Sequence, residues 1–147
     1  MPDTRIPLEV IHEVRDRCLC LATQRAARLL ARRFDRVFAP LGLTNGQFSL
    51  MVALGGPWSP KLGELAGFLA MDSATMTAAA RALQKRGLLE ISADRNDARA
   101  RRPRLTEAGR DLVARAVPLW RQEHARLDAD MSGVDTGSLA GLLRQLG

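Results

Sequence analysis

Five arginines lie close together in one short stretch of the chain. They are Arg95, Arg99, Arg101, Arg102 and Arg104, and Asp97 is the one acidic residue among them. Guanidinium groups at this density create a positive local field, which favours the binding of a polyanion, and nucleic acid is the commonest polyanion in the cytoplasm. The stretch therefore predicts a contact with nucleic acid.

The residue types of catalytic and metal sites do not occur in the patterns that such sites need. His12, His124 and the two cysteines, Cys18 and Cys20, show neither Cys-x-x-Cys nor His-x-x-x-His spacing. The sequence also has no Gly-rich phosphate loop and no Gly-x-Ser-x-Gly motif. We predict no catalytic residue, no metal site and no cofactor, and we do not expect an enzyme.

Length and composition bound the kind of protein that can carry the arginine stretch. The chain has 147 residues, of which 46% are hydrophobic, and a formal net charge of +6. This is enough apolar material for a hydrophobic core, but too short a chain for a large two-domain enzyme. No apolar run approaches the roughly 18–20 residues that span a bilayer, and no signal-peptide pattern opens the sequence. We expect a cytoplasmic protein with no membrane partner.

Long helices are predicted on both sides of the central region. Apolar residues recur at three- and four-residue steps from about residue 8 to Phe38, which predicts one helix that ends before Pro40. Thr106 is typical of an N-cap, and the apolar positions after it predict a long C-terminal helix. A last short helix is expected from about Leu139.

The central residues 44–105 predict short helices followed by a β-hairpin. Thr44 and Gln47 form a capping box, and the Asp72-Ser73 pair offers another N-cap. The expected helices are 48–54, 61–69 and 74–86, and the expected strands are 88–92 and 102–105. We therefore predict a mainly α fold with a small β-hairpin wing, a winged helix-turn-helix flanked by long terminal helices.

This order of elements suits the recognition of double-stranded DNA. The second helix of a helix-turn-helix fits the major groove of B-DNA, where its side chains meet base edges. A thin, Arg-rich hairpin beside it can reach phosphates or the more negative minor groove.

Motifs along this region resemble the signature of the MarR-type transcriptional regulators. They are Gly42-Leu43-Thr44…Gln47, Leu65-Ala66…Leu69, Thr75-Met76-Thr77, Leu83-Gln84-Lys85-Arg86-Gly87-Leu88, Asp94…Asp97…Arg99 and Leu105-Thr106…Gly109. Their order and spacing carry the resemblance, which covers nearly the whole chain. It implies a homodimer of winged helices that binds a near-palindromic operator, usually as a repressor released by a small ligand or by oxidation.

DNA contacts are expected from the helix 74–86, from the wing and from Lys61. Lys61 stands beside a helix N-terminus, where backbone amides already favour an anion. Asp97 cannot favourably approach a phosphate, so we expect it to pair with a neighbouring arginine and fix the shape of the hairpin. Arg102 is expected beside a phosphate. The predicted DNA-binding residues are Lys61, Ser73, Thr75, Thr77, Arg81, Lys85, Arg95, Arg99 and Arg101.

The terminal helices have no place inside a winged helix-turn-helix, so their apolar stripes need a partner. The same stripes on a second copy of the chain cover them most simply. We predict that residues 1–147 form a single domain in which 44–105 read DNA, while 8–39 and 106–147 form the dimer interface. A monomer with these helices packed on the winged part is the alternative.

A ligand site is expected near Trp58. Trp58 and Trp120, with apolar residues of the first helix and the nearby Arg15, predict a crevice for a small aromatic and anionic effector. The alternative is that both tryptophans belong to the core.

The two cysteines raise a further possibility. On a helix Cys20 points about 200° away from Cys18, so the pair is not expected to form a disulfide. Redox-sensing members of the resembled family hold a first-helix thiolate with tyrosines, and this chain has no tyrosine, which favours a buried structural cysteine. A thiol-based redox regulator using Cys18 or Cys20, and a winged-helix interaction module that does not bind DNA, are the alternative functions.

Overall fold

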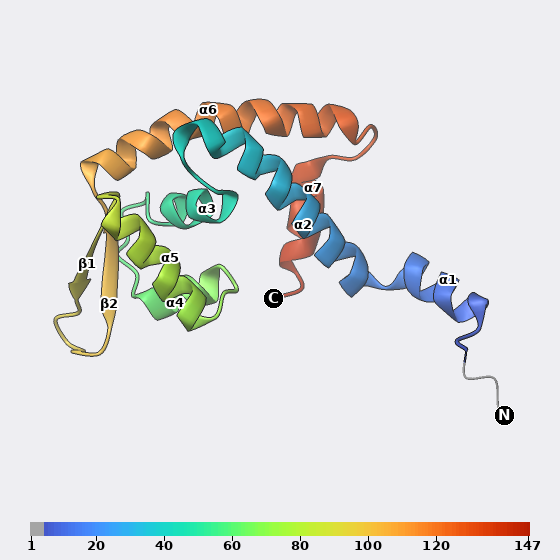
Figure 1. Ribbon diagram of the computed structural model, residues 1–147, viewed down its shortest axis with the longest axis horizontal. Helices are drawn as coiled ribbons and strands as arrows, with labels where there is room; N and C mark the ends of the chain where they lie inside the picture. Colours follow the sequence, from blue (N-terminus) through green and yellow to red (C-terminus); the bar gives the residue numbers. More distant parts are fainter. Residues whose placement is uncertain (1–4) are drawn as a thin grey trace. The chain divides into compact units, whose positions relative to one another are not determined.

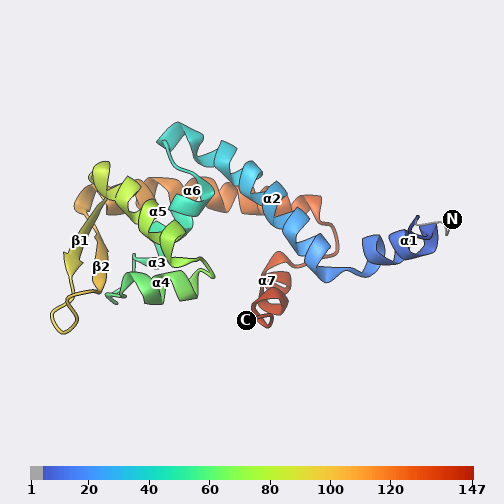
Figure 2. The ribbon, with the colours of Figure 1, turned by 60° about the horizontal axis from the view of Figure 1, so that its bottom comes forward.

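The computed structural model describes residues 5–147, and Figures 1 and 2 show it in two views. The chain divides into two compact units, one ending at Arg33 and the other running from Phe34 to Gly147. The first unit holds α1 (Leu8–Arg17) and most of α2 (Leu19–Phe38). The second holds the end of α2, the 3-10 helix η1 (Ala39–Leu41), α3 (Asn45–Ala53), α4 (Leu62–Phe68), α5 (Ser73–Lys85), β1 (Leu89–Ala93), β2 (Arg101–Leu105), α6 (Glu107–Asp130) and α7 (Thr136–Arg144).

The N-terminal helical stretch consists of two helices, so the prediction of one continuous helix is wrong. Cys18 has an extended backbone, with φ −73° and ψ 102°, and separates α1 from α2. Its Sγ accepts a 3.4 Å hydrogen bond from the N–H of Leu21 and so acts as an N-cap for α2. The apolar periodicity continues across this position, which is why it did not reveal the break.

Side-chain caps begin α3 and α5 as predicted. Thr44 Oγ1 accepts from the Gln47 N–H at 3.1 Å, and Gln47 Oε1 accepts from the Thr44 N–H at 3.0 Å. The Asp72 carboxylate accepts from the N–H of Thr75 at 2.8 Å and caps α5. Gly87 follows α5 with φ +72°, the left-handed conformation expected of a helix C-terminus.

The two strands form the antiparallel hairpin that was predicted, and this hairpin, residues 89–105, is the wing. Leu89 lies opposite Leu105, and Ala93 lies opposite Arg101. Leu89 and Leu105 are buried at the base of the wing. The helices α4 and α5 form a helix-turn-helix, and the hairpin follows it directly. This arrangement confirms the predicted fold class.

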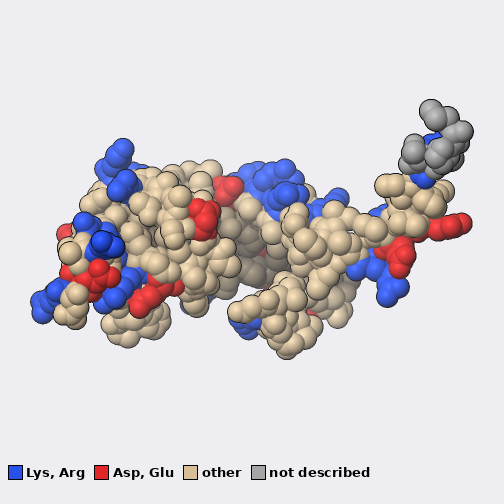
Figure 3. Space-filling model, turned by 90° about the horizontal axis from the view of Figure 1, so that it is seen from below, with Lys and Arg blue, Asp and Glu red and all other residues tan. Residues whose placement is uncertain are grey.

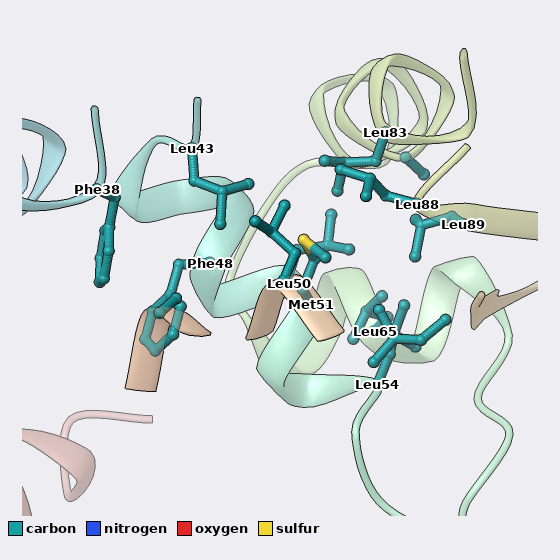
Figure 4. Close-up of a cluster of buried hydrophobic side chains, with 14 of the residues drawn as sticks. Phe38, Leu43, Phe48, Leu50, Met51, Leu54, Leu65, Leu83, Leu88 and Leu89 are labelled. Carbon is teal, nitrogen blue, oxygen red and sulfur yellow. The ribbon is translucent and has the colours of Figure 1, made fainter. Parts of the chain in front are cut away.

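One apolar core holds α3, α4, α5, the wing and the first half of α6 together (Figure 4). The rings of Phe38 and Phe48 stack with their centroids 4.4 Å apart. Met76, Ala80 and Leu83 bury one side of α5 in this core. The opposite side of α5 is therefore free for other contacts.

The start of α6 packs closely on the turn that precedes the wing. A Cβ placed on Gly109 would lie only 2.2 Å from the carbonyl oxygen of Leu88. Thr106 caps α6 as predicted, and its Oγ1 also donates to the Gly87 carbonyl at 2.7 Å. The Leu-Thr-x-x-Gly motif thus fixes the wing to α6. Within residues 5–147, no helix is both long and apolar enough to cross a membrane.

Candidate nucleic-acid interface

The wing tip, α5 and the start of α4 surround an open hollow of about 710 Å³. It brings together many of the residues predicted to bind DNA. Its lining residues are Lys61, Leu62, Gly63, Glu64, Thr77, Arg81, Asp97, Arg99, Ala100 and Arg101. Lysine and arginine outnumber the acids in this set, and Figure 3 shows basic side chains gathered among acidic ones at the wing end of the molecule. The hollow suits an anionic partner.

The exposed side of α5 presents a row of polar side chains. Ser73, Thr77, Arg81 and Lys85 follow one another at four-residue steps, so they lie along one side of the helix. Thr77 and Arg81 line the hollow, whereas Ser73 and Lys85 are exposed toward the two ends of the helix. The middle of α5 therefore faces the wing tip.

Thr75 differs from Thr77 because its hydroxyl is part of the helix cap. Thr75 Oγ1 donates to Asp72 Oδ2 at 2.6 Å, in addition to the bond from its backbone N–H. These hydrogen bonds hold the pKa of the Asp72 carboxyl below its ordinary value, and the bond from the hydroxyl has the largest effect. Sequence reasoning had no means of separating the two threonines, since both lie in the first turns of the helix.

Asp94 and Arg102 hold the wing together where its strands meet the tip loop, and sequence analysis missed this role. Arg102 Nε donates to Asp94 Oδ1, and Arg102 Nη1 donates to the carbonyl oxygen of Ser59. Asp94 Oδ2 accepts from the backbone N–H groups of Asn96 and Asp97 at 3.1 and 3.0 Å. The hydrogen bond from Arg102 lowers the pKa of Asp94 against the opposing effect of burial. An aspartate directly after a strand and before a polar connection is typical of such turns, and this pattern could have indicated the role of Asp94 from the sequence.

Asp97 folds the wing tip, but not through the arginine ion pair that we predicted. Its Oδ1 accepts from the backbone N–H of Arg99 at 3.0 Å. Arg101 Nη1 donates to the carbonyl oxygen of Ala98 at 2.9 Å. In the described part of the chain, the acid paired with a wing arginine is Asp94, and that arginine is Arg102. Arg102 was expected beside a phosphate, but its guanidinium donates to Asp94 and to Ser59 within the protein, so we assign it to the wing structure instead.

Arg86 connects the end of α5 to the turn before α3. Its Nη1 donates to the Gly42 carbonyl oxygen at 2.7 Å. Gly42 has φ +66°, and a Cβ there would lie 3.1 Å from the Arg86 guanidinium. The contact joins residues 44 positions apart, so no local pattern predicted it.

Trp58 lies beside a separate cavity of about 540 Å³ in the second unit. The cavity is lined by Ala53, Trp58, Ser59, Pro60, Glu64, Leu65 and Phe68. The side chain of Trp58 is 60% exposed and that of Trp120 is 37% exposed, so the alternative that both are core residues is wrong. Arg15 belongs to the first unit, where its guanidinium pairs with Asp16 at 2.6 Å.

Neither cysteine lies in the core, which corrects the prediction of a buried structural thiol. Cys18 is half-buried and Cys20 is exposed, and both are free thiols. Gln24 Nε2 donates to Cys20 Sγ at 3.1 Å. Because Cys18 is not helical, the angle expected between two helical side chains does not describe this pair. Among residues 5–147, no group of His, Cys, Asp and Glu has the arrangement of a metal site.

Comparisons with known proteins agree with this architecture. The model of the MarR family matches residues 43–100. The M. tuberculosis transcriptional regulator MosR, in a crystal structure with DNA, is 34% identical, and the match covers 87% of this chain and 92% of MosR with a TM-score of 0.77. The transcriptional repressor CouR, bound to a 23-mer DNA duplex, is 26% identical over 97% of this chain and 99% of its own, with a TM-score of 0.79.

A mutant of E. coli MarR complexed with operator DNA shows the same fold, with a TM-score of 0.77 at 21% identity, over 91% of this chain and 96% of that protein. None of the curated proteins matches the chain. The family match covers most of the helix-turn-helix and the wing, and the identity to MosR extends over most of both proteins. The chain therefore belongs to the MarR family of transcriptional regulators.

Proposed function

We propose that the chain is a homodimeric repressor that binds a near-palindromic operator on double-stranded DNA and is released by a small ligand. The observation that carries DNA binding is the hollow, because cations from three different elements converge there. Lys61 comes from the start of α4, Arg81 from α5 and Arg99 from the wing. Convergence of this kind provides both a positive field and a shape into which a duplex fits.

The residues around the hollow divide into base-reading and phosphate-binding groups. Thr77 and Arg81 lie on the exposed side of α5, the second helix of the helix-turn-helix, and it is this helix that enters the major groove in such proteins. Arg99 lies at the wing tip, where it reaches a phosphate or the minor groove. The phosphate contacts proposed around them are Lys61, Ser73, Lys85, Arg95 and Arg101.

The proposal of a dimer rests on apolar surface that each chain leaves uncovered. None of the residues of α1 or α7 is buried. The exposed apolar side chains of the terminal elements are Ile6, Leu8, Val10, Ile11, Val14, Leu19, Leu21, Leu29, Leu30, Leu139, Leu142, Leu143 and Leu146. Apolar surface of this extent is unfavourable in water, and a second copy supplies a matching surface. A dimer also presents two recognition helices, which a near-palindromic operator requires.

Two relatives support the proposal of repression at DNA. MosR was crystallised with DNA, and CouR is named a transcriptional repressor and was bound to a duplex. Release by a ligand requires that the ligand bind the DNA-competent and the DNA-incompetent dimers with different affinities.

The test is binding of the full chain to the DNA upstream of its own coding sequence, measured by fluorescence anisotropy. A scrambled duplex of equal composition is the reference. We expect the upstream DNA to bind at least about a thousandfold more tightly. Arg81→Ala should reduce this preference, and Arg115→Ala, which removes an exposed arginine of α6, is the matched control. Equal affinity of the unchanged chain for both duplexes would contradict the proposal.

A further inference from the structure

The cavity beside Trp58 lies wholly within the second unit and shares one lining residue, Glu64, with the hollow between the wing tip and α5. Its walls come from the end of α3, from residues 58–60 and from α4. Its volume of about 540 Å³ lies within the range of small-molecule sites, which is about 300–1,000 Å³. Phe68, which also lines the cavity, is 78% exposed, so its ring is accessible to a ligand.

The chemistry of the walls selects the kind of ligand. Trp58 Nε1 donates to the Ala53 carbonyl at 2.7 Å, so the indole has no free donor and offers its ring. Phe68 offers a second ring, and Leu65 and Pro60 add apolar surface. Aromatic rings pack favourably on other aromatic rings, so these walls suit a planar aromatic ligand.

Glu64 determines the charge that the cavity accepts. It is the one ionisable residue among those lining the cavity, and its Oε2 accepts from the backbone N–H of Lys61 at 2.7 Å. A carboxylate at the rim repels an anion and tolerates a neutral or cationic molecule. The anionic aromatic effector expected from the sequence does not suit this cavity.

The same chain segment reaches the wing and the DNA-facing hollow. The carbonyl oxygen of Ser59, next to Trp58, accepts from Arg102, which is paired with Asp94 where the strands of the wing meet its tip loop. Lys61, two residues further on, lines the hollow. A ligand that moves residues 58–60 therefore acts on the anchor of the wing and on one of the proposed phosphate contacts.

We propose that the cavity of Trp58 and Phe68 binds an uncharged or cationic planar aromatic ligand, and that its occupation weakens DNA binding through the Ser59–Arg102 contact. The regulatory part of this inference rests on the proposed function, while the binding part does not.

The binding test uses two probes of equal size and different charge, 2-naphthol and 2-naphthoate, with the full chain in equilibrium dialysis. We expect 2-naphthol to bind at least about tenfold more tightly than 2-naphthoate, and Glu64→Gln to reduce this difference. Phe68→Ala should weaken 2-naphthol binding about three- to tenfold, because one of the two packing rings is removed. Val52→Ala, an exposed apolar residue of α3 outside the cavity, should leave it unchanged. Absence of 2-naphthol binding, or equal binding to the Phe68→Ala chain, would overturn the site.

The regulatory test measures the affinity for the upstream DNA with and without saturating 2-naphthol. We expect weaker DNA binding with the probe and a smaller effect in Arg102→Ala, in which the wing anchor is absent. An unchanged affinity in the presence of bound probe would overturn the regulatory part, while DNA binding without the probe would still support the proposed function. A chain that binds the probe but no DNA would contradict the proposed function and leave the site standing.

Discussion

Arg102 on β2 pairs with the carboxylate of Asp94, the residue that follows β1, and so ties the two strands together where the tip loop begins. The strand register explains this partnership. Ser92 lies opposite Arg102, and Asp94 is two residues beyond Ser92 on the same face of the hairpin, which makes Asp94 and Arg102 diagonal neighbours. Because Arg102 also bonds to Ser59, the wing is anchored to the segment that precedes α4.

The ion pair predicts an acid dependence of stability. The pKa of Asp94 is lowered in the folded chain, so its ionised form stabilises the fold at pH values above the unfolded pKa of about 4. This stabilisation disappears as the pH falls through the lower folded pKa. We expect the urea midpoint to fall between pH 6 and pH 3, and to fall less in Asp94→Asn, which should start from a lower midpoint at pH 6. An equal fall in both chains would contradict this role of Asp94.

A second prediction concerns the close packing of α6 on the turn before the wing. Gly109→Ala would place a Cβ 2.2 Å from the Leu88 carbonyl oxygen. We expect a decrease of about 1–3 kcal/mol in the free energy of unfolding, measured by urea titration, because the backbone must shift. Gly67→Ala in α4 is the control, since no atom lies within 4 Å of its added Cβ, and it should be neutral or stabilising. Equal decreases in the two variants would show that the close approach is unimportant.

The cysteines provide a third prediction. Cys18→Ser should preserve the start of α2, because serine is a good N-cap, and Cys20→Ser should change little at an exposed position. Both variants should bind the upstream DNA as the unchanged chain does, before and after mild peroxide treatment. If peroxide abolishes DNA binding, and either substitution prevents this, the redox alternative replaces release by a ligand.

A fourth prediction tests the dimer. The full chain should sediment as a dimer at micromolar concentration. Leu142→Asp, on the apolar surface of α7, should raise the dissociation constant at least about tenfold, because it places a charge in an apolar interface. Gln145→Asp adds a charge at a nearby polar position and should have little effect. A folded monomer of the unchanged chain at these concentrations would exclude two-half-site binding.

Features that depend on near neighbours in the sequence could be predicted. The caps at Thr44, Asp72 and Thr106 join groups three residues apart, and the conformation of Gly87 follows from its place after a helix. The hairpin and the order of its motifs were predicted for the same reason. The break at Cys18 could not be predicted, since neither residue type nor periodicity changes there.

Contacts between distant segments required the structure. Arg86 meets Gly42, and Arg102 meets Ser59, over separations of 44 and 43 residues. The sequence places Asp94 and Asp97 equally close to several arginines, and only the strand register decides which acid makes the ion pair. The distinction between Thr75 and Thr77 likewise depends on the hydrogen bond to Asp72.

The central claim, that α5 and the wing read DNA, is tested most directly by a salt titration of operator and random-sequence affinities for Thr77→Ala and Arg99→Ala. Arg99→Ala should weaken binding to every sequence and reduce the salt slope by about 0.9 for each phosphate that the protein no longer neutralises. Thr77→Ala should leave the slope intact and reduce discrimination by about 1–3 kcal/mol for each half-site. Slopes and discrimination equal to those of the unchanged chain in both variants would mean that the hollow between α5 and the wing is not the DNA-reading surface.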